Sequence, residues 1–409
     1  MNLNIDMKKP KYKLGEVISY KKGKKPNELF LFKEKNDVIP YLTADYLRGD
    51  NNPQWCAQND LNITKVNESD IIMIWDGSNS GQTFTGFKGA LASTMVKILP
   101  KKEKILHPNY LFYYLYMKSR FLNYATIGTG VPHVSKAVFL NLDIIIPYID
   151  IQNKIAKILS NIDGSIKNIQ RLIHNTTLLK QGLLQQLLSK GIGHTEFKET
   201  TLGRIPKNWE VKELGDIYKE IRGGTTPSRE NPEYYNGNIL WITSSELDFN
   251  IIKDTKEKIT TKAVKDSNLK IYPRKTFVIA IFGLEAEGTR GRCAILGRDA
   301  TINQACLAFS ENQNIDPYYL FQYYCYYGPY ICLKYSQGTK QQNLYSHTVK
   351  KIPIKIPPME EQKTIAKILS DFDKYIQHEQ LILNKFNLIK KGLMQQLLTG
   401  RIRVIADRS

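Results

Sequence analysis

A long internal repeat constrains the fold of this 409-residue chain more than any other feature. Residues 152–192 and residues 362–402 align without a gap, and the motifs IAKILS and KxGLxQQLL recur in both copies. Weaker similarity lies upstream, where LGEV (14–17) matches LGDI (214–217). Because self-similarity at a fixed offset marks a duplicated structural unit, we expect a globular segment followed by a helix, twice over.

Each copy of the repeat has the apolar spacing of a long amphipathic helix. Apolar residues recur at alternating intervals of four and three, which is the heptad seam of a coiled coil. Such a helix would be ~55 Å long at about 1.5 Å per residue. The two equal seams favour helices that pack on each other, and the alternative is two separate helices, each lying on its own domain. The predicted seam residues are Ile155, Leu159, Ile162, Ile166, Ile169, Ile173, Leu183 and Leu187 in the first helix, and Ile365, Leu369, Phe372, Ile376, Leu383, Phe386, Leu393 and Leu397 in the second.

Polar residues interrupt both seams at matching places. Lys180 and Lys390 occupy equivalent seam positions, and polar residues in a seam can fix the register of a helix pair. Gly182 and Gly392 also match, and each would either bend its helix or admit a close neighbour, at a cost of ~1 kcal/mol relative to alanine. The two lysines are therefore hypothetical register-fixing residues.

The globular segments combine short strands with aromatic-rich helices. The apolar runs DIIMIW (70–75) and TFVIAIF (276–282) predict strands, while residues 110–122 and 318–333 predict helices packed by aromatic side chains. The middles of the two segments show little similarity to each other. The predicted fold class is α+β, with two mixed α/β domains related by internal duplication and joined by two long helices.

The ends of the repeats also define the domain boundaries. A polar linker with Gly and Pro, residues 191–209, joins the two halves. The predicted domains are a first globular domain at 1–150, a first spacer helix at 151–192, a second globular domain at 193–357, and a second spacer helix with the C-terminal tail at 358–409.

The charge balance favours a polyanionic partner. Lys plus Arg total 58 against 39 Asp plus Glu, and the resulting net charge of +19 is typical of nucleic-acid binding. The five cysteines include no CxxC motif, which supports neither a disulfide framework nor a zinc site. No apolar run reaches the ~20 residues that span a bilayer, and no signal peptide is evident, so we expect a cytoplasmic protein.

Two motifs resemble catalytic sites only superficially. NPEY (231–234) is similar to the NPPY motif of amino-methyltransferases, but no Gly-rich cofactor loop precedes it. GLEAEGTR (283–290) has the spacing of a phosphate-binding loop, but Thr289 and Arg290 stand where Lys and then Ser or Thr are required. Neither HExxH nor GxSxG occurs. We therefore predict no catalytic residues and no metal site in this chain.

Polar loops at equivalent places in the two segments are better candidates for binding DNA. Basic residues surround Gly23 in the first segment, and Arg, Thr and Ser surround Gly223 and Gly224 in the second. Phosphate contacts use Lys, Arg and hydroxyl groups, whereas base edges are recognised by Arg, Asn, Gln or Ser. For each residue the alternative is an ordinary solvated loop. The candidate DNA-binding residues are Lys22, Lys24, Lys25, Ser78, Asn79, Gln82, Thr83 and His133 in the first segment, and Arg222, Thr225, Thr226, Ser228, Arg229, Arg290, Arg292, Lys340, Gln341, Gln342 and Asn343 in the second.

Several stretches, taken in order, resemble the specificity subunits of Type I restriction–modification systems. DGSNSGQTFTGFKGALASTMV (76–96) and GTGVPHVSKAVFLNLDIIIP (128–147) resemble the first target-recognition domain of that family. RIPKNWEVKELGDI (204–217), residues 222–247 and ATINQACLAF (300–309) resemble the second. The two helices with KILS and GLxQQLL resemble its spacer regions, so the resemblance covers nearly the whole chain.

The resemblance implies a non-catalytic DNA-binding subunit. Each target-recognition domain would read one half of a split, asymmetric site in double-stranded DNA, and the helices would form an antiparallel coiled coil that sets the spacing. Two methyltransferase subunits and two ATP-dependent restriction subunits would assemble on this scaffold. S-adenosylmethionine, ATP and Mg²⁺ are expected on those partners, and this chain would bind no cofactor directly.

The N-terminal copy departs from the family pattern in one place. KPKYKLGEV (9–17) stands where the second copy has an IPKNW-like lead-in. The opening strand of the first domain is therefore left undetermined by the resemblance.

Two other classes of function remain as alternatives. A stand-alone DNA methyltransferase or nuclease would need cofactor or metal motifs that the sequence lacks. A structural coiled-coil scaffold that binds only proteins would not account for the +19 charge or for the differing middles of the two segments. Both alternatives therefore fit the sequence less well than a DNA-reading subunit does.

Overall fold

The structure is a computed structural model that describes residues 10–33, 37–50, 52–127, 131–338 and 341–402. Within these residues, no helix combines the length and the apolar character that a membrane span requires.

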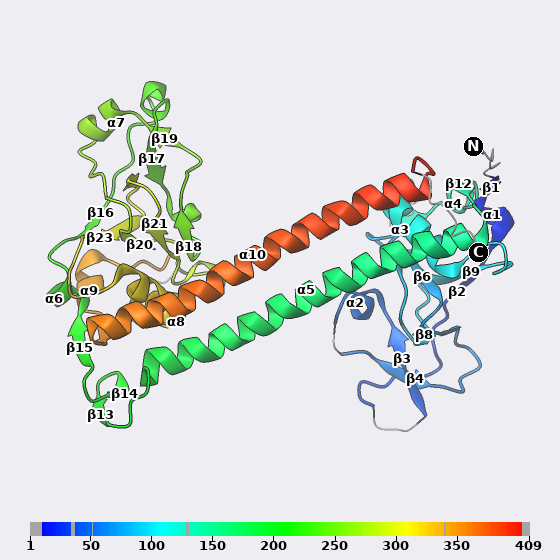
Figure 1. Cartoon of the computed structure of the whole chain (residues 1–409), viewed down its shortest axis with the longest axis horizontal. Helices are drawn as coiled ribbons and strands as arrows, with labels where there is room; N and C mark the ends of the chain where they lie inside the picture. The colour runs from blue at the N-terminus through cyan, green and yellow to red at the C-terminus, as the bar shows by residue number, and fades with distance from the viewer. Residues whose placement is uncertain (1–9, 34–36, 51, 128–130, 339–340, 403–409) are drawn as a thin grey trace, which may run out of the picture. The chain divides into compact units, whose positions relative to one another are not determined.

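Two compact units make up the chain, and each contains part of both long helices (Figure 1). Unit 1 comprises Met1–Gln170 with Leu381–Ser409, and unit 2 comprises Arg171–Gln380. Helix α5 (Ile149–Lys190) begins in unit 1 and ends in unit 2, whereas α10 (Met359–Leu398) begins in unit 2 and ends in unit 1. The two long helices that the repeat predicts are therefore present.

The globular part of unit 1 is built mainly from two four-stranded sheets. Its strands are β1 (Lys11–Lys13), β2 (Ile18–Lys22), β3 (Val38–Leu42), β4 (Trp55–Ala57), β5 (Lys65–Val66), β6 (Ile71–Ile74), β7 (Thr83–Phe84), β8 (Gly89–Leu91), β9 (Met95–Pro100), β10 (Thr126–Ile127), β11 (His133–Val134) and β12 (Asp143–Ile145). Its helices are α1 (Leu14–Val17), α2 (Ala44–Leu47), α3 (Pro108–Tyr124) and α4 (Lys136–Leu140). One sheet has the antiparallel order β2-β9-β6-β7, and the other has the order β4-β3-β8-β5 with β3 parallel to β8.

The globular part of unit 2 is built around a five-stranded and a three-stranded sheet. Its strands are β13 (Phe197–Thr200), β14 (Gly203–Pro206), β15 (Glu210–Glu213), β16 (Ile221–Gly223), β17 (Ile239–Ile242), β18 (Asn250–Ile252), β19 (Lys258–Ile259), β20 (Phe277–Ala280), β21 (Cys293–Leu296), β22 (Ala300–Ile302), β23 (Cys306–Phe309) and β24 (Pro353–Ile356). Its helices are α6 (Leu214–Ile217), η1 (Pro232–Tyr235), η2 (Ser244–Glu246), α7 (Thr261–Asp266), η3 (Glu287–Thr289), α8 (Pro317–Tyr335) and α9 (Ser346–Lys350). The sheet orders are β16-β23-β20-β21-β18 and β19-β17-β22.

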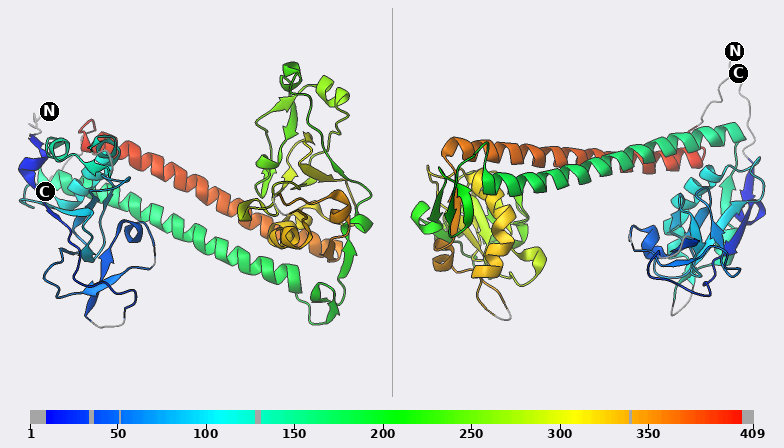
Figure 2. Two further views of the ribbon diagram at one scale, coloured as in Figure 1. Left: turned by 180° about the vertical axis from the view of Figure 1, so that it is seen from behind. Right: turned by 90° about the horizontal axis from the view of Figure 1, so that it is seen from below.

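The two units share a common strand framework. The order β2-β9-β6 in unit 1 corresponds to β16-β23-β20 in unit 2, and the parallel pair β3·β8 corresponds to β17·β22. An aromatic helix follows in each unit, α3 or α8, and Figure 2 shows each of them beside the sheet of its own unit. The predicted strands at 70–75 and 276–282 and both predicted aromatic helices are confirmed, and so is the internal duplication.

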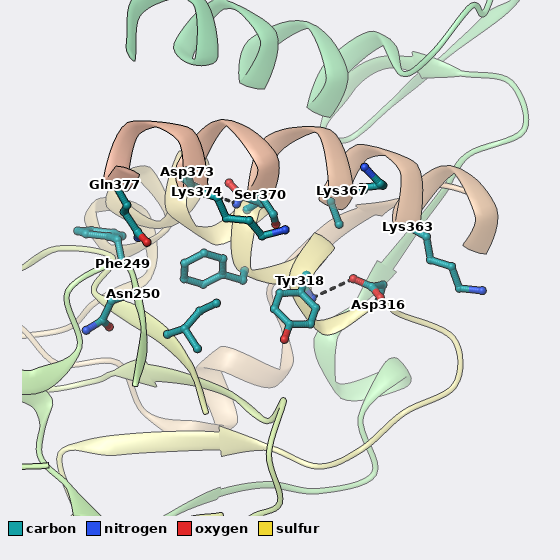
Figure 3. Close-up of a pocket in the computed structure, with 14 residues that line it drawn as sticks. Phe249, Asn250, Asp316, Tyr318, Lys363, Lys367, Ser370, Asp373, Lys374 and Gln377 are labelled. Carbon is teal, nitrogen blue, oxygen red and sulfur yellow. Dashed lines mark hydrogen bonds between the residues drawn. The ribbon is translucent and has the colours of Figure 1, made fainter. Parts of the chain in front are cut away.

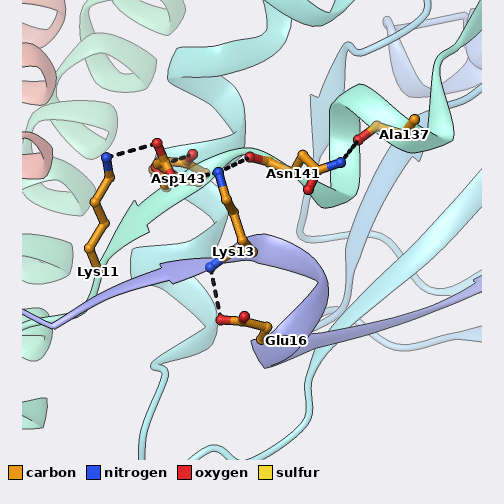
Figure 4. A network of polar contacts seen from close by, with 7 residues as sticks. Lys11, Lys13, Glu16, Ala137, Asn141 and Asp143 are labelled. Carbon is orange, nitrogen blue, oxygen red and sulfur yellow. Dashed lines mark hydrogen bonds and ion pairs between the residues drawn. The ribbon is translucent and has the colours of Figure 1, made fainter.

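The opening strand of unit 1 is β1, which pairs with β12 (Figure 4). Lys11 and Lys13 both form ion pairs with Asp143, at 2.8 and 2.9 Å, and hydrogen bonds from these lysines lower the pKa of Asp143 to about 2. The equivalent pairing in unit 2 joins β15 to β24. Residues 11–13 therefore supply the strand that β15 supplies in unit 2, without an IPKNW motif.

A buried glutamine anchors the start of each long helix to its globular part. Gln152 Nε2 donates to the carbonyls of Ile105 and Pro147, and its Oε1 accepts from the backbone N–H of His107. Gln362, at the matching position of the repeat, does the same in unit 2 with Asn314, Pro357 and Asp316. Because an unpaired buried backbone group is costly, these three bonds fix where each helix begins.

The long helices are antiparallel and share a core with the globular part in each unit. In unit 1, Ile155 and Leu159 of α5 lie in the same core as Leu397 of α10. In unit 2, Leu187 of α5 lies in the same core as Leu369 of α10. All the predicted seam residues are buried or half-buried, which is expected of a heptad seam.

Candidate nucleic-acid interface

Four described segments of unit 1 that are distant in sequence meet at one end of the β2-β9-β6 sheet. The backbone N–H of Gly23, after β2, donates to Met95 O at 2.9 Å. The N–H of Trp75, after β6, donates to Thr94 O at 2.8 Å, and Val134 N donates to Trp75 O at 2.9 Å. These bonds bring together the predicted DNA-binding loops around Gly23, residues 78–83 and His133, with the start of β9 between them. We call these three loops loop cluster 1.

An equivalent cluster, which we call loop cluster 2, lies at the matching end of the unit 2 sheet. The N–H of Ile281, after β20, donates to Ala305 O at 3.0 Å, and Leu344 N donates to Ile281 O at 2.8 Å. Leu284 N donates to Gln342 O at 3.1 Å. The hydrogen bonds therefore follow the scheme of loop cluster 1, although the loop sequences differ.

Glycines allow the backbones within each cluster to approach closely. A Cβ atom at Gly23 would lie 2.0 Å from Ala92 O, and one at Gly224 would lie 1.7 Å from Ile302 O. Gly223 has more room, since its nearest neighbour would be 3.5 Å away. The offset of 200 that aligns LGEV (14–17) with LGDI (214–217) pairs Gly23 with Gly223, but the contacts show that Gly224 is the equivalent residue.

The exposed candidate side chains of the two clusters differ in chemistry. Those of unit 1 are three lysines, a serine and an asparagine, whereas those of unit 2 are two arginines, a threonine, a serine and a glutamine. Lys22 also forms an ion pair with Asp76, at 2.9 Å, within loop cluster 1. The exposed candidates are Lys22, Lys24, Lys25, Ser78, Asn79, Arg222, Thr225, Ser228, Arg229 and Gln341.

Comparison with known proteins identifies the family. The family model described as the Type I restriction modification DNA specificity domain matches residues 6–175 and 206–387. The chain belongs to this family. One relative, the Type I restriction enzyme MjaVIII specificity subunit of Methanocaldococcus jannaschii, is 34% identical over 96% of this chain and 92% of its own length. The predicted family is therefore confirmed, and the chain is a specificity subunit rather than a catalytic one.

Two further matches extend the comparison. The Type I restriction enzyme EcoR124I/EcoR124II specificity subunit of Escherichia coli is 26% identical over 50% of this chain and 51% of its own length. The crystal structure of the Type I restriction–modification S subunit from M. genitalium has a TM-score of 0.62 and covers 97% of this chain and 98% of that one, at 15% identity. At this identity, the likeness shows a shared fold.

Three arginines that the sequence analysis assigns to DNA are held by local contacts in this specificity subunit. Arg229 pairs with both carboxylate oxygens of Glu257, at 2.5 and 2.9 Å, and lies over the Tyr235 ring at 4.2 Å. Arg290 donates to the carbonyls of Leu284 and Glu285, and Arg292 donates to the carbonyl of Gly288. Arg290 and Arg292 therefore stabilise their own loop, whereas Arg229 connects its loop to Glu257, which is distant in sequence.

Other candidates differ in how far they reach the surface. Thr83 is buried and its hydroxyl donates to Gly81 O, so this residue does not present a group to DNA, contrary to the sequence analysis. His133 is half-buried and pairs with Ile127 between β10 and β11. Gln342 and Asn343 are half-buried in loop cluster 2. Lys340 lies outside the described residues, as does the segment 128–130 before His133.

The structure adds two polar residues that sequence reasoning missed. Gln304 Oε1 accepts a hydrogen bond from the hydroxyl of Thr226, which is half-buried. Arg48 Nε donates to Gln82 Oε1 at 3.1 Å. Gln304 lies inside the ATINQACLAF motif, but no local pattern brings Arg48 next to Gln82, because the two residues meet only through the fold.

The two superficially catalytic motifs have structural roles. NPEY forms the short helix η1, which Asn231 caps by accepting from Glu233 N, while Tyr235 OH donates to Pro227 O. GLEAEGTR is followed by strand β21 rather than by the helix that a phosphate-binding loop requires. Among the residues that the structure describes, no three or more His, Cys, Asp or Glu side chains are grouped to hold a metal ion.

Unit 2 also contains a pocket of about 360 Å³ between α10 and the segment at the start of β18 (Figure 3). Figure 3 shows Lys363, Lys367 and Lys374 on α10, with Phe249 and Asn250 on the other segment. Lys367 and Lys374 both pair with Asp371. The lining combines apolar side chains with lysines and with polar groups such as Asp316, Gln322 and Asp373.

Proposed function

We propose that this specificity subunit reads a bipartite, asymmetric site in double-stranded DNA, one half with each unit, and holds the methyltransferase and restriction subunits that act there. The observation behind this proposal is the duplication of one loop cluster on one framework, with different side chains in each copy. A symmetric reader would repeat the same side chains. Two unlike clusters fit two unlike half-sites.

The chemistry of both clusters suits DNA. Lys24 and Lys25 in unit 1 and Arg222 in unit 2 are exposed cations that can contact phosphate. Asn79 and Gln341 are exposed amides, which can donate and accept hydrogen bonds at a base edge. Because phosphate contacts release counterions, binding by such surfaces falls steeply as salt concentration rises.

The long helices offer a surface for partner subunits. Beside the buried seam, α5 exposes Leu178 and Leu179, and α10 exposes Leu388 and Ile389 at the matching positions of the repeat. Leu179 is 57% exposed and Ile389 is 50% exposed. An exposed apolar patch on a helix favours the docking of another protein surface. We propose that helices of the methyltransferase subunits cover these positions.

The cofactors belong to the partners in this proposal. Two methyltransferase subunits would use S-adenosylmethionine, and two restriction subunits would use ATP and Mg²⁺. This specificity subunit would bring them to one DNA site without binding any of these cofactors itself. The purified chain is therefore expected to show no turnover with S-adenosylmethionine or Mg²⁺, and turnover by the chain alone would favour a stand-alone enzyme.

Methylome sequencing of a host that carries this chain with its methyltransferase subunits tests the proposal. Methylated adenines are expected in one split sequence motif. Replacing residues 210–350 with the same region of a relative should change only one half of that motif. A change in both halves, or no methylation that depends on this chain, would contradict the proposal. Binding to partners but never to DNA would favour a purely structural scaffold.

A further inference from the structure

One carboxylate in unit 1 joins the globular part to both long helices. Asp163 of α5 accepts a hydrogen bond from the hydroxyl of Tyr113, on α3, at 2.8 Å. The same carboxylate pairs with Lys390 Nζ, on α10, at 2.5 Å. Burial raises the pKa of Tyr113, so its hydroxyl stays protonated and donates. We call these three residues the unit 1 junction.

The matching positions form a second junction in unit 2. Asp373 of α10 accepts a hydrogen bond from Gln322 Nε2, on α8, at 2.8 Å, and pairs with Lys180 Nζ, on α5, at 2.5 Å. Asp373 lies on α10 at the edge of the pocket in Figure 3. The long helices exchange roles, since the carboxylate comes from α5 in unit 1 and from α10 in unit 2.

Both junctions are shielded from solvent far more than the ion pairs formed within α10. The side chains of Lys390 and Lys180 are 13% and 15% exposed, and their carboxylate partners are 33% and 34% exposed. In contrast, the pair formed by Lys367 and Asp371 on α10 is 77% and 46% exposed. A shielded charge depends on its particular partner, whereas an exposed one is satisfied by water.

The two junctions differ in how completely their groups are satisfied. In unit 1, Lys390 also lies over the Tyr116 ring, at 4.4 Å from its centroid. In unit 2, Gln322 is buried, and its Oε1 has no hydrogen-bond partner among the described residues. A buried acceptor without a partner weakens the structure around it. The two junctions therefore differ in the side chains that surround the ion pair.

We infer that Asp163 and Asp373, with their lysines, are positioning residues that hold each globular part on its helix pair and so restrict the DNA spacer length that the chain accepts. This inference rests on the proposed reading of a bipartite site. Leu and Ile in an apolar seam can exchange partners when helices shift or rotate, but a shielded ion pair has one partner. One base pair of spacer changes the half-site separation by about 3.4 Å and its rotation by about 35°. A loosened junction would tolerate such a change.

The experiment compares spacer preference in the complex of this chain with its methyltransferase subunits. Methylation is measured on duplexes with the spacer found in the wild-type methylome and with spacers one base pair shorter and longer. The test variants are K390M/D163L for unit 1 and K180M/D373L for unit 2, which replace each ion pair by apolar residues. The matched control is K367M/D371L, which removes an exposed pair from α10.

The junction variants are expected to methylate the native spacer and to lose about tenfold of the preference against the altered spacers, while the control keeps wild-type preference. Unchanged preference in both junction variants would overturn the inference. If a double variant loses its helical circular dichroism signal, Asp163→Asn and Asp373→Asn, which remove only the charge, give the same readout. Absence of any spacer preference in the wild type would instead contradict the proposed function.

Discussion

Units 1 and 2 repeat one framework but present different surfaces. The buried anchors match closely, since Gln152 and Gln362 make the same three hydrogen bonds. The hydroxyls of Tyr110 and Tyr319 likewise donate to the equivalent strands β12 and β24, at Ile145 O and Lys355 O. The loop clusters carried by these frameworks differ in almost every exposed side chain. Positions that hold the frame are thus repeated, and positions that face outward are not.

This difference distinguishes the residues that support the fold from the residues that we propose recognise DNA. A core position must fill a fixed volume and satisfy buried polar groups, which leaves few acceptable residues. An exposed loop residue has no such constraint, so the two copies can present unlike groups. The comparison between the units predicts that changes to the frame have equal effects in both, whereas changes to the loops affect only one half of the recognised DNA.

The largest expected effect comes from the glutamine anchors. Gln362→Leu should destabilise the chain by about 2–4 kcal/mol, because each buried backbone group left without a partner costs about 1–3 kcal/mol. Gln152→Leu should cost a similar amount in unit 1. Urea denaturation followed by circular dichroism measures both, with the exposed Gln181→Leu as the control. If only one of the two substitutions lowers the free energy of unfolding strongly, the two glutamines are not equivalent.

Substitutions of the glycines test which residue of unit 2 is equivalent to Gly23. Gly224→Ala should cost about 1–3 kcal/mol and weaken DNA binding, since its Cβ would overlap Ile302 O and force the backbone to move. Gly23→Ala should behave alike in unit 1. Gly223→Ala is the matched control and should be nearly neutral. If Gly223→Ala is the more damaging change, the contact-based equivalence is wrong. Denaturation midpoints and binding at fixed salt provide the readouts.

Two neighbouring arginines test the separation of support from recognition within one unit. Arg229→Ala should lower stability by about 1 kcal/mol, because it removes a surface ion pair and an aromatic contact. It should leave the recognised sequence unchanged. Arg222→Ala should leave stability nearly unchanged but weaken DNA binding and reduce its salt dependence. Thermal melts and DNA titrations at two salt concentrations distinguish the two, and the opposite pattern would reverse the assigned roles.

The smallest expected effect is acid-dependent and concerns the β1–β12 pair. The two lysine partners hold the pKa of Asp143 at about 2, below its ordinary 3.8. The stabilisation is therefore complete above about pH 4 and is lost as the pH falls towards 2. Asp143→Asn should melt slightly below the wild type at pH 5, and the difference should vanish near pH 2. A difference that persists at pH 2 would point to a cause other than this ion pairing.

Sequence patterns predicted the repeated frame because its signals are local and periodic. The heptad spacing of the seam residues determines two long helices, and the IAKILS and QQLL motifs show that they are copies. The same patterns predicted the aromatic helices and the central strands. The roles of Arg229 and Thr83 were not predictable in this way, because Glu257, Tyr235 and the burial of β7 are set by residues distant in sequence.

What the sequence determined by itself was therefore the duplication, the α+β fold class and the family. What only the tertiary structure decided was which groups meet. It paired Lys180 with Asp373 and Lys390 with Asp163, and it assigned the close approach to Gly224. Periodicity reports which face of a helix or strand is buried, but a contact between distant residues depends on how whole elements pack. That packing is a property of the folded core, and no short stretch of sequence contains it.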